Sequence, residues 1–105
     1  MKHPIHFVQS FEHAGPWTLL VRFEDGVSRQ VDFRPVLHGR LFGPLRALAV
    51  FNQVRLDPEV RTLVWPNGAD FDPATLYDWP EEGPLLAARA SEWETAGTLA
   101  GVRAQ

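Results

Sequence analysis

The chain has 105 residues, of which 45% are hydrophobic and 22% are charged, with a formal net charge of −3 and no cysteine. This composition is typical of one globular domain and excludes an intrinsically disordered protein. The lack of cysteine excludes disulfide bonds, thiolate nucleophiles and thiolate metal sites. Positive charge is scattered and comes almost entirely from arginine, so we expect no direct binding to nucleic acid.

The N-terminal segment 1–11 lacks the long apolar stretch of a signal peptide. No later segment is long and apolar enough to span a bilayer. We therefore expect a cytoplasmic protein without membrane association.

A β-hairpin is expected after a short N-terminal strand over residues 6–11. In residues 17–24, apolar and polar side chains alternate, which is the period of a strand with one buried face. Asp25 and Gly26 then form a strong hairpin signal. Residues 27–33 alternate in the same way and are predicted to be the returning strand.

Proline and glycine then break the strand period. We expect one helical turn over residues 36–39, capped by its final glycine, and a short helix over residues 44–49 that begins with proline. Residues 51–57 and 61–65 are predicted to form a second hairpin. Pro66 ends it, because proline cannot donate a hydrogen bond to the ladder.

The segment from Trp65 to Trp79 concentrates turn and cap residues. Asn67 and Gly68 predict a turn with positive φ, and Asp72 precedes Pro73 as the N-cap of a short helix over residues 73–78. We interpret the segment as a structural clasp that fastens this helix to the sheet. The expected clasp residues are Trp65, Pro66, Asn67, Gly68, Asp70, Asp72, Leu76 and Tyr77.

A C-terminal helix is predicted over residues 84–95, after a break at residues 80–83. The chain carries more large aromatic side chains than one small core buries fully, so the C-terminal segment either folds back and buries Trp79 and Trp93 or offers them to a partner as an apolar surface. The expected partner-binding residues are Trp79, Leu85, Leu86, Arg89 and Trp93. The predicted organisation is a compact domain over residues 1–80 and a partly mobile helical tail over residues 81–105.

The predicted fold class is therefore α+β. A small antiparallel sheet is built from two hairpins and an N-terminal strand, with short helices packed on it and a helical C-terminal segment.

Several short motifs occur in a fixed order, at residues 23–26, 31–33, 64–70 and 76–77. Together they resemble the small bacterial family known as domain of unknown function 2442, over roughly the first four-fifths of the chain. The resemblance implies a compact α+β unit and no established catalytic residues. It also implies pairing with a small co-encoded protein, in the manner of an antitoxin. Some members carry an added helix-turn-helix domain, for which this chain has no room.

Candidate catalytic or metal-binding groups are few. Asp70 and Asp72 are a pair of carboxylates that suits a hard cation, and an enzyme would need them to meet His38 in space. A turn contact for Asp70 and a helix cap for Asp72 explain both residues better. Because His3, His6, His13 and His38 are scattered, we predict no metal site and no cofactor.

The predicted function is a non-catalytic protein-interaction module with a small co-encoded partner. The alternative is a small-molecule-sensing domain with a pocket between sheet and helices. A homodimer formed through exposed strand edges also stays open.

Overall fold

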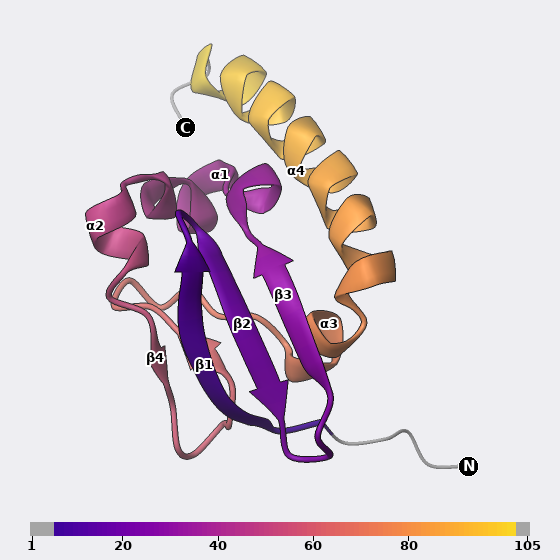
Figure 1. Ribbon diagram of the computed structural model, residues 1–105. Coiled ribbons are helices and arrows are strands. Elements are labelled where there is room, and N and C mark those ends of the chain that lie inside the picture. Colours follow the sequence, from indigo (N-terminus) through magenta and orange to yellow (C-terminus); the bar gives the residue numbers. More distant parts are fainter. Residues whose placement is uncertain (1–5, 103–105) are drawn as a thin grey trace.

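The computed structural model describes residues 6–102, with side chains described for residues 6–92. Its centre is an antiparallel three-stranded sheet (Figure 1). The strands are β1 (Val8–Gly15), β2 (Thr18–Phe23) and β3 (Ser28–Asp32), in that spatial order.

Short helices and a second, two-stranded sheet follow along the chain. They are the 3₁₀ helix η1 (Arg34–Val36), α1 (Gly39–Phe42), the 3₁₀ helix η2 (Gly43–Arg46), α2 (Leu48–Phe51), β4 (Arg55–Leu56), β5 (Leu63–Val64), α3 (Pro73–Tyr77) and α4 (Trp79–Val102). This is the small α+β fold that the sequence predicts.

The hairpin of β2 and β3 confirms the expected alternation. Leu19, Val21 and Phe23 of β2 are buried, whereas the polar positions of β3 on the outer face are exposed. The two strands pair from Thr18 opposite Asp32 to Arg22 opposite Ser28. The sheet therefore presents one apolar face to the core.

The segment predicted as a strand over residues 51–57 is mostly not a strand. The backbone N–H groups of Val50 and Phe51 both donate to the carbonyl of Ala47, at 2.9 and 3.0 Å, so Phe51 ends α2. Only Arg55 and Leu56 pair with the returning strand. The second hairpin exists as predicted, but it is short.

The helical turn expected over residues 36–39 also lies elsewhere. The chain forms η1 two residues earlier, and Gly39 starts α1 instead of capping the preceding turn. Pro44 takes an early position in η2, as expected, although the helix ends at Arg46 and α2 is a separate element.

The expected break at residues 80–83 is wrong, because α4 begins at Trp79 and continues through 24 residues. Pro80 falls in the first turn, where a helix needs no backbone N–H. The carbonyl of Asp78 accepts from the N–H groups of Glu81 and Glu82, both at 2.8 Å. The expected boundary between residues 80 and 81 thus lies inside a helix.

Helix α4 begins beside α3, runs past the β3 side of the sheet and continues over α1, so that it contacts α3, η1 and α1 (Figure 1). Nowhere in residues 6–102 does a helix combine the length and the apolar character that crossing a bilayer requires.

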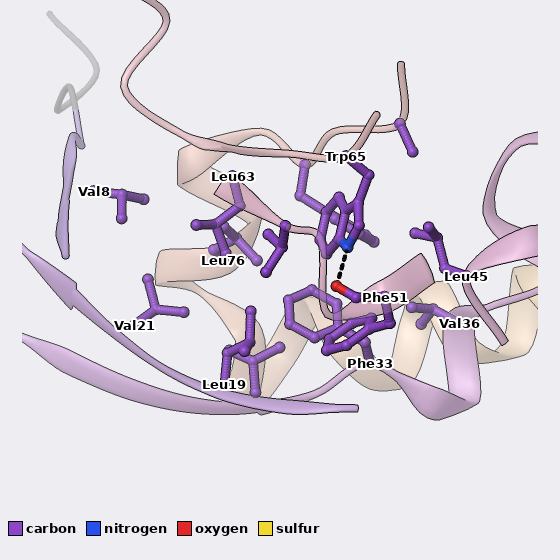
Figure 2. Packing of buried hydrophobic residues seen from close by; sticks show 14 of the residues in the cluster. Val8, Leu19, Val21, Phe33, Val36, Leu45, Phe51, Leu63, Trp65 and Leu76 are labelled. Carbon is purple, nitrogen blue, oxygen red and sulfur yellow. Dashed lines mark hydrogen bonds between the residues drawn. The ribbon is translucent and has the colours of Figure 1, made fainter. Parts of the chain in front are cut away.

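The core lies between the sheet and the segment from Phe51 to Leu76 (Figure 2). The ring of Phe33 packs against Phe51 and Trp65, with ring centroids 5.6 and 5.7 Å away. Trp65 is buried, and its indole N–H donates to the carbonyl of Phe51 at 2.9 Å. This contact fastens the second hairpin to the end of α2.

We expect Trp65→Phe to lower the free energy of unfolding by about 2 kcal/mol, because it removes buried volume and the indole bond to the carbonyl of Phe51, which then keeps only the N–H of Val54 as a donor. Urea unfolding measures the loss. The matched control is Trp17→Phe, which removes a bond of 3.0 Å to the carbonyl of Leu45 at a half-buried site. Trp17→Phe should lower the free energy of unfolding by about 1 kcal/mol. Equal losses in the two variants would contradict the larger structural role of Trp65.

Candidate functional site

The predicted clasp is a tight turn followed by a capped helix. Gly68 has a φ of 92°, which favours glycine, and the N–H of Trp65 donates to the carbonyl of Ala69 at 2.9 Å. The Asn67 side chain accepts from the N–H of Ala69 at 3.1 Å and donates to the carbonyl of Leu41 at 2.9 Å. The contact with Leu41, which the sequence did not reveal, ties the turn to α1.

Asp72 is the N-cap of α3, since its carboxylate accepts from the N–H of Ala74 at 2.9 Å. Asp70 does not make the expected contact with the turn amides. It pairs through its backbone with Val64, while Asn67 takes the role in the turn.

Asp70 and Asp72 border one small recess of about 140 Å³ between α3 and α4. Among the residues whose side chains are described, no three His, Asp or Glu groups come together as metal ligands. His3 lies outside the described residues.

Tyr77 joins four segments at the end of α3. Its hydroxyl donates to the carboxylate of Asp25 at 2.6 Å, and its backbone carbonyl accepts from Arg29 Nε at 2.6 Å. The ring of His6 stacks on the ring of Tyr77, and the two ring centroids lie 3.6 Å apart. Arg29 is a half-buried residue of β3, and its bond to Tyr77 accounts for a polar side chain at this position.

The Tyr77 hydroxyl is the largest influence on Asp25 and holds the pKa of that carboxyl below its usual value. In return, the bond to Asp25 raises the pKa of Tyr77 above 10.0. A raised phenol pKa opposes action as a base or nucleophile near neutral pH. The arrangement therefore fits a structural lock between the β2–β3 turn and α3.

An open apolar groove of about 350 Å³ lies between η1 and the first turns of α4. We call it the Trp79 groove, and its lining residues are Asp32, Pro35, Val36, Trp79, Pro80, Gly83, Pro84 and Ala87. The ring of Trp79 packs inward against Phe33 and Phe71, at centroid distances of 5.6 and 6.1 Å.

The expected partner-binding residues divide between two faces of α4. Trp79 and Leu86 are half-buried and pack against the core. Leu85 is 59% exposed, and Arg89 is exposed one turn later. The side chain of Trp93 lies outside the described residues.

We expect Asp72→Ala to lower the free energy of unfolding by about 1 kcal/mol, because the N–H of Ala74 loses its acceptor. Chemical denaturation measures the change. Asp70→Ala is the matched control in the same recess. It removes no cap, so its effect should stay within about 0.5 kcal/mol, and a larger loss in Asp70→Ala than in Asp72→Ala would contradict the capping role.

The Tyr77–Asp25 bond predicts a dependence of stability on pH at both extremes. Asp25 has a lowered folded pKa, so its contribution is present at neutral pH and is lost as pH falls below about 3.8. Tyr77 has a raised folded pKa, so its contribution is complete below pH 10.0 and is lost as pH rises through the folded value.

In Tyr77→Phe we expect the pKa of Asp25 to rise toward 3.8 and the alkaline loss to shrink. NMR titration of the carboxyl carbons measures the first change. Asp57 is the internal control, because the turn amides of Glu59 and Val60 lower its pKa independently of Tyr77. An unchanged Asp25 titration would refute the lock.

A family model described as protein of unknown function (DUF2442) matches residues 8–82. The match begins with β1 and ends in the first turn of α4, so it covers both hairpins, the clasp and α3 over more than half of the chain. No curated protein and no solved structure matches.

Proposed function

The chain belongs to the DUF2442 family, and from that premise we propose that it is a non-catalytic protein-interaction module. We further propose that its partner is a small co-encoded protein, which it binds in the manner of an antitoxin. The family resemblance supports the choice of partner, and the surface of α4 supports the mode of binding.

The observation that carries this proposal is the outer face of α4. Leu85 is more exposed than any other large apolar side chain among the described residues. Arg89 lies four positions later, so the two side chains share one helix face. An exposed leucine beside an arginine is suited to a protein interface, where the arginine supplies an aliphatic stem and a forked donor.

The opposite face of α4 holds this surface in place. Gly83 and Ala90 are buried, and Leu86 packs on the core. A helix fixed in this way presents its outer residues with little loss of conformational entropy on binding. This is the mode in which a helix face docks into a partner's groove.

The three groups with shifted pKa values fit structural roles rather than acid–base catalysis. The pKa values of Asp25 and Asp57 are lowered and that of Tyr77 is raised, so each moves away from neutrality. A general acid or base needs a pKa near the working pH. Each pKa shift also arises from a hydrogen bond that holds a turn or the end of a helix in place.

A small-molecule-sensing domain is the second candidate, and the Trp79 groove is the observation that favours it. Its volume of about 350 Å³ suits a small ligand, but it is open, whereas ligand pockets enclose most of their ligand. A metabolite that raises the melting temperature of the protein alone would support this candidate.

Light scattering of the protein alone, and then with its co-encoded neighbour at micromolar concentration, tests the interaction proposal. We expect a heteromer, and we expect Leu85→Glu to weaken it at least tenfold, because it places a charge where an apolar contact forms. Both variant and parent should unfold at the same urea concentration, since the side chain is exposed.

Val60→Glu is the matched control, because Val60 is 55% exposed and lies in the turn between β4 and β5. Its affinity for the neighbour should equal that of the parent. Absence of a heteromer would overturn the proposal, and equal weakening by the two variants would remove the role of α4.

A further inference from the structure

Trp79 differs from the other two tryptophans whose side chains are described. The indole N–H of Trp17 donates to the carbonyl of Leu45, and that of Trp65 donates to the carbonyl of Phe51. Among the described residues, the N–H of Trp79 has no acceptor. Indole N–H groups usually find one when they are buried.

The unpaired N–H of Trp79 reaches solvent, and Trp79 lines the groove. Every buried side-chain nitrogen or oxygen among the described residues has a partner, so this unpaired one reaches solvent. A Cβ added to Gly83 would lie 2.8 Å from Trp79 Nε1, and both residues line the groove. The glycine therefore lets the indole of Trp79 pack directly against the backbone of α4.

The rest of the groove is apolar and stiff. Pro35, Pro80 and Pro84 contribute rings that lose no rotamer freedom on binding, and Asp32 is the one charged residue of the lining. A ligand would therefore meet flat apolar walls, one hydrogen-bond donor and one negative charge.

These features select the form of the ligand. A helix offers no free carbonyl along its length, because each is bonded within the helix. A polyproline II segment has no internal hydrogen bonds, so its carbonyls are available, and its rings pack against aromatic-lined grooves. A basic residue beside the prolines would meet Asp32.

We propose that the Trp79 groove binds a proline-rich extended segment of the partner protein, with a backbone carbonyl of that segment accepting the Trp79 N–H. The proposal rests on the proposed function, since it names the part of the partner that docks next to the outer face of α4. Leu85 follows Pro84 directly in the chain, so one partner can contact both surfaces.

The first test is a ¹⁵N NMR titration of the full chain with a proline hexamer flanked by one arginine at each end. The indole signal of Trp79 should move progressively to a plateau, while those of Trp17 and Trp65, which already donate to carbonyls, should stay. A control peptide with glycine and serine in place of the prolines keeps the charge and should leave the signals of Trp17, Trp65 and Trp79 unmoved. An unmoved Trp79 signal at millimolar peptide would overturn the proposal.

Two variants locate the contacts. Trp79→Phe keeps a ring against Phe33 and Phe71 but removes the N–H, and it should weaken peptide binding about tenfold. Asp32→Asn should remove the preference for arginine-flanked over glutamate-flanked peptide. Val60→Glu lies outside the lining and should bind the peptide like the parent; equal binding by Trp79→Phe and the parent would refute the hydrogen bond.

Competition separates this proposal from the proposed function. If the heteromer forms and the proline peptide displaces the neighbour, the groove proposal and the interaction module both stand. If the heteromer forms and the peptide neither binds at Trp79 nor competes, the groove proposal fails while the interaction module stands. If the peptide binds at Trp79 but no heteromer forms, the groove holds and the choice of partner fails.

Discussion

The hydrogen bond from the Trp65 indole to the carbonyl of Phe51 is the contact on which the arrangement of the other elements depends. A buried indole must pair its N–H, and a carbonyl at the end of a helix lacks a partner within that helix. The carbonyl of Phe51 accepts the indole N–H together with the backbone N–H of Val54, which lies 3.1 Å away. The indole bond fixes the second hairpin relative to α2, and the rings of Phe33, Phe51 and Trp65 all contact one another.

Packing around Phe33 extends to the start of α4, the helix whose outer face is the proposed binding surface. The ring of Phe33 also meets Phe71, which precedes the helix cap at Asp72, and Trp79, which starts α4. The start of α4 is therefore held by the same aromatic cluster that holds the sheet. A surface fixed by a core in this way is preorganised for a partner.

Hydrogen bonds of Tyr77 and Asn67 connect elements at the surface of the fold. Tyr77 connects the β2–β3 turn to the end of α3, and Asn67 connects the second hairpin to α1. Both ends of the clasp are thus anchored in other parts of the chain. The many special residues between Trp65 and Trp79 are explained by this geometry.

The sequence by itself determined the features that depend on near neighbours. The alternation in β2, the turn at Gly26, the cap at Asp72 and the order of motifs that identifies the family all follow from residues a few positions apart, as do both hairpins and the α+β class. Such features can be read from sequence because strand period, turn φ and cap bonds involve only local backbone geometry.

Only the tertiary structure decided the features that depend on distant partners. Phe51 joins a helix, and Tyr77 finds Asp25 across 52 positions. Pro80 was expected to interrupt the helical structure, but it lies in the first turn of α4, where the carbonyl of Asp78 accepts from the N–H groups of Glu81 and Glu82. The indole N–H groups of Trp17 and Trp65 find carbonyls 28 and 14 positions away, whereas that of Trp79 has no acceptor among the described residues. Long-range packing chooses among backbone states of similar local energy, and no local pattern contains that choice.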